Sequence, residues 1–242
     1  MIKFIFKKFL IFTIILFISS IANAQNYNYS TPQRYKLNDI NNKERIIFIV
    51  DFSNSMVERV NGKRKIDIAL STLEKILPLI PENTYVGLRV YGHRGGLTYF
   101  DSCKASSLVA PISLNNSLNI QNKLNELSPQ GSTPITYSLK QAIKYDFGYF
   151  TGRKRIILLS DGGENCDESP CQYALELIKE RNDFRIDVIA LDVNDKDANN
   201  QLKCVALATS GKFYKANTSA ELFKSFSDSL NIKKEVQGVI LP

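Results

Sequence analysis

Two carboxylates and three hydroxyls follow or lie between two apolar segments of this chain. The apolar run 46–50 leads directly into the first carboxylate, and the run 156–159 leads, after one serine, into the second. The residues concerned are Asp51, Ser53, Ser55, Thr133 and Asp161. Mg²⁺ prefers octahedral oxygen ligands and gives up its waters reluctantly, so a few hydroxyls with carboxylates that hold metal-bound water suit it. The set therefore predicts a site for a hard divalent cation such as Mg²⁺.

Each part of this set has a plainer interpretation when it is taken alone. An isolated Asp-x-Ser-x-Ser arises by chance in ordinary chains. Thr133 before Pro134 is typical of a helix N-cap followed by a proline at the first helical position. Asp161 before two glycines is typical of a turn. Only their joint placement, after two apolar strands and at a helix start, favours the metal.

The elements that must position these residues alternate between strand and helix. Apolar and β-branched runs predict strands at 45–50, 85–91, 107–112, 155–160, 185–193 and 212–216, with Val86, Leu88 and Val90 on one side of the second. Helical spacing predicts helices at 66–77, 118–127, from 133 onward, 172–179, 201–209 and 220–230. Such alternation implies an α/β fold, with a doubly wound, mainly parallel, Rossmann-like sheet flanked by helices. Ligands of such folds bind beyond the carboxyl ends of strands, where Asp51 and Asp161 are expected.

The first 24 residues have the pattern of a secretory signal peptide. A basic segment, 1–8, precedes an apolar run, 9–18, and an Ala-x-Ala site that ends at Ala24. We expect cleavage there, a periplasmic or secreted protein, and no stable membrane span afterwards; a retained membrane anchor is the alternative. Residues 25–43 are then a polar linker, 44–230 the folded domain and 231–242 a C-terminal tail.

Net charge argues against nucleic acid as a partner. Loss of the signal segment, which holds three lysines and no acid, lowers the formal charge from +7 to +4. Such a value is modest for a chain of this size, and the basic residues are scattered. The densest groups, 63–65 and 153–155, are expected to be solvated surface.

Four cysteines predict two disulfides in an exported protein: Cys103, Cys166, Cys171 and Cys204. A four-cysteine zinc site is the competing interpretation, but it lacks the paired Cys-x₂-Cys spacing. Cys166 could pair locally with Cys171, which leaves Cys103 for Cys204. Alternatively Cys171 and Cys204, each expected near the start of a helix, could pair. The sequence leaves the connectivity open.

The residues of the predicted cation site resemble those of the von Willebrand factor type A (VWA) domains. Segments 51–55, 131–134 and 160–162 are similar to the three parts of that family's metal-ion-dependent adhesion site, and the resemblance extends over about 44–230. Segments 88–94, 101–103 and 160–166 are similar to exported bacterial members.

The resemblance implies the VWA fold and a Mg²⁺ or Mn²⁺ ion held by Ser53, Ser55 and, in one state, Thr133. Asp51 and Asp161 would act mainly through water or as switching ligands. A protein ligand would supply a carboxylate to the metal, in adhesion or in the assembly of an envelope complex. Side chains beside the site that could contact this partner are Asn54, Met56, His93, Arg94, Glu164 and Asn165.

Two other functions are weighed against this one. A metal-dependent hydrolase would need a base, and the only histidine, His93, lies in a glycine-rich loop, although Glu164 could replace it. A structural domain with a vestigial metal site is the third candidate, against which all five predicted residues are present. We expect a binding protein rather than an enzyme.

Overall fold

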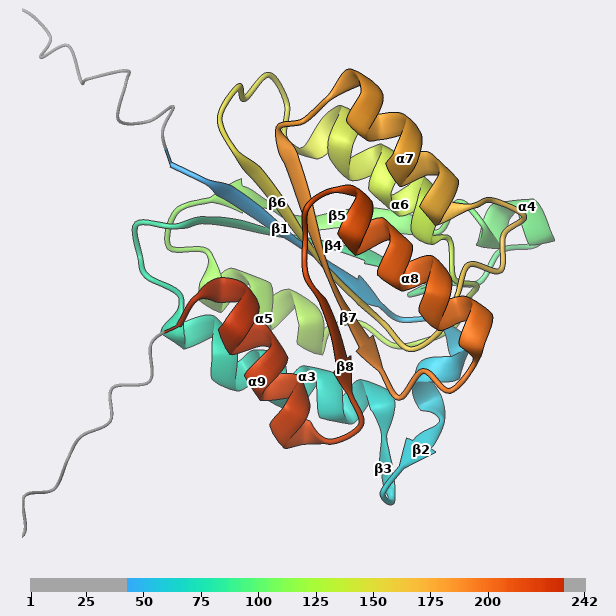
Figure 1. Ribbon diagram of the computed structural model, residues 1–242. Coiled ribbons are helices and arrows are strands. Elements are labelled where there is room, and N and C mark those ends of the chain that lie inside the picture. The colour runs from blue at the N-terminus through green and yellow to red at the C-terminus, as the bar shows by residue number, and fades with distance from the viewer. Residues whose placement is uncertain (1–42, 233–242) are drawn as a thin grey trace, which may run out of the picture. The chain divides into compact units, whose positions relative to one another are not determined.

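Continuous apolar runs, which favour strands buried on both faces, form the centre of a six-stranded sheet (Figure 1). The structure is a computed structural model and describes residues 43–232. The strand order is β5-β4-β1-β6-β7-β8, with β5 antiparallel to β4 and all other neighbours parallel. The strands are β1 (Arg45–Asp51), β4 (Tyr85–Tyr91), β5 (Ser106–Ser113), β6 (Lys154–Ser160), β7 (Phe184–Leu191) and β8 (Phe213–Ala216). The predicted doubly wound, mainly parallel sheet is confirmed.

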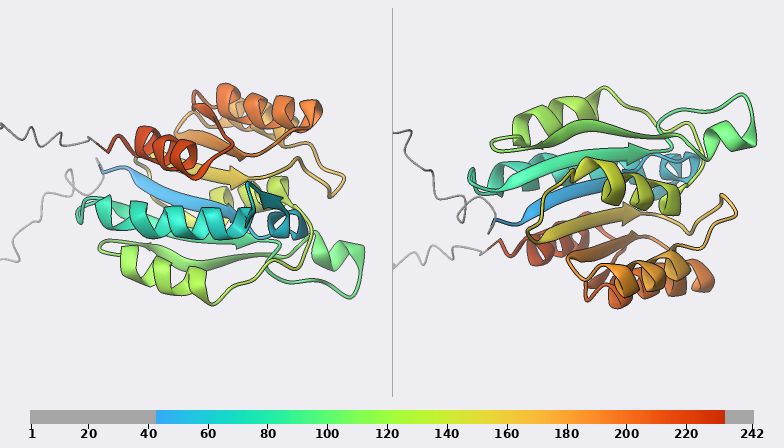
Figure 2. Two further views of the ribbon diagram at one scale, coloured as in Figure 1. Left: turned by 90° about the horizontal axis from the view of Figure 1, so that it is seen from below. Right: turned by 90° about the horizontal axis from the view of Figure 1, so that it is seen from above.

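Helices cover both faces of the sheet (Figures 1 and 2). One face carries α3 (Lys65–Ile76), α5 (Ser117–Asn125) and α9 (Ser219–Leu230), and the other carries α6 (Ile135–Gln141), α7 (Pro170–Glu180) and α8 (Lys196–Ala208). Alternate residues of β1 supply the two cores: Ile46 and Phe48 pack with the first set of helices, whereas Ile47 and Ile49 pack with the second. The side chains of β1 thus point alternately to the two faces of the sheet and contribute to both hydrophobic cores.

Short elements complete the domain. They are the hairpin β2 (Arg59–Val60) and β3 (Lys63–Arg64), the helix α4 (Tyr99–Ser102), the 3₁₀ turns η1 (Asn54–Val57) and η2 (Leu77–Leu79), and the π-helical segment η3 (Ala142–Asp146). The sequence pattern does not predict α4, η3 or the hairpin strands, because elements this short carry too few residues for a periodic signal.

Strand order reverses at β1, which lies between β4 and β6. The chain first builds outward from β1 through β4 to β5, then returns to β6 on the other side of β1. The carboxyl ends of β1 and β6 therefore meet at the switch point, where crevices form in sheets of this kind. Asp51 ends β1, and Asp161 directly follows β6.

Three details differ from the sequence-based expectations. The second face of β4 is also buried, because Arg89 pairs with Asp146 of η3 there and Tyr91 lies fully inside. Helix α8 begins at Lys196, ahead of the predicted 201. The basic groups 63–65 and 153–155 are only partly solvated, since Lys65, Lys154 and Arg155 are buried.

Two disulfides are present, as predicted, and they join Cys103 to Cys166 and Cys171 to Cys204. Cys171 is the second residue of α7, but Cys204 lies in the later part of α8 rather than near its start, because that helix begins earlier than expected. The local Cys166–Cys171 pairing is wrong.

The predicted signal segment, most of the linker and most of the tail lie outside the described residues. Within 43–232, no helix is both long and apolar enough to cross a membrane.

Candidate metal centre

Asp51 is held in one orientation at the carboxyl end of β1. Its Oδ1 accepts the backbone N–H of Ser53 at 2.7 Å, and its Oδ2 accepts the hydroxyls of Tyr91 and Ser160 at 2.9 and 2.8 Å. The side chain is fully buried. Burial, followed by the nearby charge of Asp161, raises the pKa of Asp51 to about 6. A cation at this edge would favour the ionised form that burial disfavours.

The two predicted serines lie together on the turn that leaves β1. Ser53 forms an isolated bridge with Gly131 and precedes η1, whose tight winding brings Ser55 back beside it. The two hydroxyl oxygens are 3.0 Å apart, and Ser55 Oγ donates to Asp161 Oδ1 at 2.7 Å. Hydroxyls from the end of β1 thus meet a carboxylate from the end of β6.

Asp161 is buried and also contacts Lys65, which no sequence pattern marks as part of the site. Its Oδ2 accepts a hydrogen bond from Lys65 Nζ at 3.1 Å. Lys65 is the first residue of α3 and belongs to the basic group 63–65, which gave no sign of a buried member. This contact places a positive charge beside the predicted cation site.

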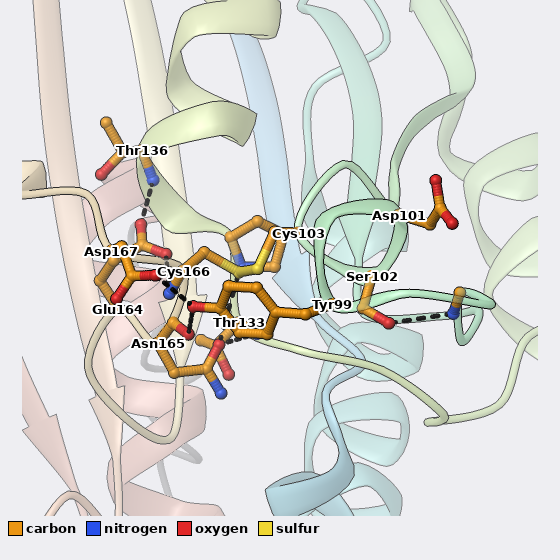
Figure 3. The surroundings of a disulfide bond; sticks show 12 residues. Tyr99, Asp101, Ser102, Cys103, Thr133, Thr136, Glu164, Asn165, Cys166 and Asp167 are labelled. Atoms are coloured by element: carbon orange, nitrogen blue, oxygen red, sulfur yellow. Dashed lines mark hydrogen bonds between the residues drawn. A yellow bond between two sulfur atoms is a disulfide. The ribbon is translucent and has the colours of Figure 1, made fainter.

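Thr133 does not cap the helix that follows it, so the N-cap interpretation is wrong. Helix α6 begins at Ile135 with Pro134 at the cap position and no side-chain cap bond. Instead, Glu164 Oε2 accepts the backbone N–H of Thr136 at 2.7 Å (Figure 3). With Glu164 in this role, the buried Thr133 side chain is not required for capping.

Backbone contacts fix the Thr133 segment against the serine turn. The Asn54 N–H donates to the Gly131 carbonyl at 2.9 Å, and the Gly131 N–H donates to the Gly92 carbonyl at 2.8 Å. Gly92 has φ +68°, and a Cβ there would lie 2.6 Å from Ser53 N. Only glycine fits such a conformation at such a close approach.

A second set of contacts holds the loop that follows Asp161 (Figure 3). Asn165 Oδ1 accepts the Thr133 N–H at 2.7 Å, and the Asn165 carbonyl accepts the Tyr99 hydroxyl at 2.8 Å. The Cys103–Cys166 disulfide ties the same loop to the end of α4. The covalent link and the hydrogen bonds therefore connect α4, the 161–167 loop and Thr133.

The two candidate bases, His93 and Glu164, both have shifted pKa values. Burial, and then the charge of Arg94, lowers the pKa of the half-buried His93. Burial raises the pKa of Glu164, but both of its oxygens already accept backbone N–H groups, from Thr136 and from Cys166.

The chemistry of the donor set fits a hard cation. Among residues 43–232, no group of three or more His, Cys, Asp or Glu side chains could hold a metal by itself. The assembled groups are hydroxyls together with two acidic side chains, Asp51 and Asp161, which suit Mg²⁺ or Mn²⁺ better than a soft metal.

Residues 45–229 match the family model described as the von Willebrand factor type A domain. The chain is 30% identical over 181 residues to the uncharacterized protein YwmD of Bacillus subtilis (strain 168), covering 73% of this chain and 80% of YwmD.

Two solved structures share the fold. Proximal thread matrix protein 1 from the mussel byssus, with zinc in its MIDAS motif, aligns with a TM-score of 0.59 and 19% identity over 78% of this chain and 45% of that one. This chain thus spans less than half of that protein. The vWF domain of the type V pili tip protein Mfa5 from Porphyromonas gingivalis aligns with a TM-score of 0.57 and 15% identity over 79% and 97% of the chains. The match of the family model, over most of the described residues, shows that this chain belongs to the von Willebrand factor type A domain family.

Proposed function

We propose that this protein binds Mg²⁺ or Mn²⁺ and uses the ion to bind a carboxylate of a protein partner. Ser53, Ser55 and Thr133 would hold the ion directly, whereas Asp51 and Asp161 would hold its waters and balance its charge. The main support for this proposal is a pair of contacts: Ser53 Oγ lies 3.0 Å from Ser55 Oγ, and Ser55 Oγ lies 2.7 Å from Asp161 Oδ1. These contacts gather oxygen groups from two strand ends at the switch point of the sheet.

Two further observations support an intact metal-ion-dependent adhesion site. Thr133 is buried and does not serve as the helix cap, and its segment contacts the serine turn through Gly131. Proximal thread matrix protein 1, which shares the fold, has a zinc-occupied MIDAS motif. A bound cation keeps residual positive charge when few acidic groups touch it, so it attracts an external carboxylate.

The partner is a protein in the cell envelope or outside the cell. Mfa5, a pili tip protein with the same fold, supports a role in adhesion or in envelope assembly. Two disulfides favour an oxidising compartment, which agrees with an exported bacterial protein that carries a cleaved signal peptide. We propose a periplasmic or secreted location.

We also propose that the metal bridges two proteins and does not catalyse a reaction. Hydrolysis would need a base near metal-bound water, and Glu164 is engaged by backbone N–H groups. A domain with a vestigial site is the remaining candidate, and metal titration separates it from the proposal.

Calorimetric titration of Mg²⁺ and Mn²⁺ tests the metal site. We expect saturable binding to the protein and at least a tenfold loss of affinity in Ser55→Ala, which removes a ligand and the donor to Asp161. Ser71→Ala, at an exposed position of α3, is the matched control and leaves affinity unchanged. Absence of binding, together with a melting temperature that neither metal changes, would support the vestigial site instead.

Partner binding is tested with envelope proteins passed over the immobilised protein in Mg²⁺ and in chelator. The expected partner is retained in Mg²⁺, released by chelator, and not retained by Ser55→Ala. A partner that is still retained in chelator and by Ser55→Ala would contradict a metal bridge.

A further inference from the structure

Lys65 has its charged group inside the protein, where lysine is rarely found. The residue is 5% exposed, and three carboxylates surround its ammonium. The distances from Lys65 Nζ are 2.8 Å to Glu58 Oε2, 3.1 Å to Asp161 Oδ2 and 4.0 Å to Asp192 Oδ2. These acids come from three segments: the residue after η1, the end of β6 and the end of β7.

The local fold holds Lys65 in this position. The β2–β3 hairpin brings the chain back on itself, and the Lys65 N–H donates to the Glu58 carbonyl at 2.9 Å. Burial lowers the pKa of Lys65, but hydrogen bonds and charges from Glu58 and Asp161 outweigh burial and raise it. With three carboxylates within 4.0 Å, the ammonium keeps its charge beside the predicted cation site.

This contact divides the two oxygens of Asp161 between different partners. Oδ1 accepts the Ser55 hydroxyl at 2.7 Å, whereas Oδ2 accepts the Lys65 ammonium. Oδ1 thus contacts a predicted metal ligand, Ser55, whereas Oδ2 is occupied by the hydrogen bond from Lys65. The ammonium, which Glu58 and Asp192 also approach, offsets part of the negative charge that Asp51 and Asp161 would present to a metal.

We infer that Lys65 is a positioning residue that fixes Asp161 and lowers the affinity of the site for a divalent cation. Its positive charge repels the cation across a short distance in a poorly solvated region. Strong metal binding then needs a further negative charge, which a partner's carboxylate would supply. This inference rests on the proposed function and adds to it the reason why metal and partner bind together.

The test compares full-chain Lys65→Met with the original protein by Mn²⁺ calorimetry and by melting in chelator and in Mn²⁺. Lys65→Met keeps the length of the stem and removes the charge. We expect at least tenfold tighter Mn²⁺ binding, a lower melting temperature in chelator and a larger upward shift on adding Mn²⁺. Lys65→Arg keeps the charge and stays within about threefold of the original affinity. Lys75→Met, at an exposed position of the same helix, changes neither quantity.

A purely structural lysine would give a different result. Lys65→Met would then melt at a lower temperature while its Mn²⁺ affinity stayed equal or fell, and that outcome overturns the inference alone. Binding by Lys65→Met but not by the original protein would support it. Absence of binding in both proteins would overturn the inference together with the proposed function.

Glu58→Gln provides a second measurement if Lys65→Met fails to fold. The Glu58 side chain is 64% exposed, so this change is compatible with folding. It removes a negative charge that competes with Asp161 for the ammonium. We expect Mn²⁺ affinity to fall two- to threefold, and unchanged or tighter binding would overturn the inference.

Discussion

Buried charges are paired differently at the two ends of the strands of the sheet. At the amino ends of the strands, Arg155 pairs with Glu44 at 2.6 Å, Arg185 pairs with Asp187 at 2.8 Å, and Lys154 pairs with Asp183. At the carboxyl ends, two buried carboxylates, Asp51 and Asp161, lie near each other, and only Asp161 contacts the ammonium of Lys65, which Glu58 and Asp192 also approach.

This difference separates a structural charge cluster from the proposed metal site. Where each buried charge has an opposite partner, the cluster stabilises the fold and attracts little else. Where negative charge exceeds positive charge and hydroxyls lie beside it, a cation lowers the free energy of the folded state. Substitutions at one set of strand ends alone test whether the two clusters have these separate roles.

Asp187→Ala should produce the largest effect, on stability only. Asp187 is fully buried and accepts from Arg185, from the Ser229 hydroxyl at 2.7 Å and from the Lys212 N–H at 2.9 Å. Its removal leaves these donors unpaired, so the free energy of unfolding in urea should fall by about 3 to 5 kcal/mol. Mn²⁺ affinity should stay within twofold. Asp197→Ala, at an exposed site on α8, is the control; a parallel loss of metal affinity in Asp187→Ala would break the distinction between the edges.

Loss of each disulfide should have a somewhat smaller effect on stability and should distinguish the loop beside the proposed metal site from the contact between α7 and α8. The bonds close loops of 63 and 33 residues, so replacing either pair by serines should lower stability by about 2 to 4 kcal/mol. Only loss of Cys103–Cys166 should also weaken Mn²⁺ binding, because that bond holds the loop that contacts Thr133. Calorimetry on both serine variants measures this. Equal metal affinity in the two variants would disprove the coupling of the 161–167 loop to the site.

Asp51→Asn should stabilise the metal-free protein. The pKa of Asp51 is about 6 when folded and near 3.8 when unfolded, so its contribution to stability is fully present below 3.8 and lost as pH rises through 6. At pH 7 the ionised group costs up to about 3 kcal/mol. An amide can keep the Ser53 N–H bond and donate to Tyr91 and Ser160, whose hydroxyls also accept.

The measurement is unfolding in chelator between pH 4 and 8. The original protein should lose stability across this range relative to Asp51→Asn, and Mn²⁺ should restore it in the original protein alone. If the original protein were more stable than Asp51→Asn at pH 7 in chelator, burial of the ionised Asp51 would not destabilise the fold.

Much of the architecture could be predicted because strands and helices here obey simple periods. The run 46–50 is apolar throughout, which marks a strand covered on both faces, and alternation with helices fixes a parallel sheet. The order of elements then locates Asp51 and Asp161 at one edge. Which strands are neighbours, and so whether Ser55 meets Asp161, depends on packing over long sequence separations.

Other features gave no local signal. Lys65, Lys154 and Arg155 belong to basic groups that look like ordinary surface, and their burial depends on acids distant in sequence. The disulfide connectivity depends on which segments pack together, and four cysteines in a sequence do not show this. The capping of α6 by Glu164 could not be predicted because the acid is 28 residues away from Thr136.

Gly92 has a practical meaning for redesign of the binding face. Its backbone lies against both Ser53 and Ser132, at distances that exclude a methyl group, so this position beside the proposed metal site allows no side chain. A few residues further on, Leu97 and Phe100 are exposed, and α4 projects from the same edge (Figure 2). Redesign of this face would therefore change the exposed side chains Leu97 and Phe100 and leave Gly92, Tyr99 and Cys103 as they are, because the last two connect α4 to the loop that contacts Thr133.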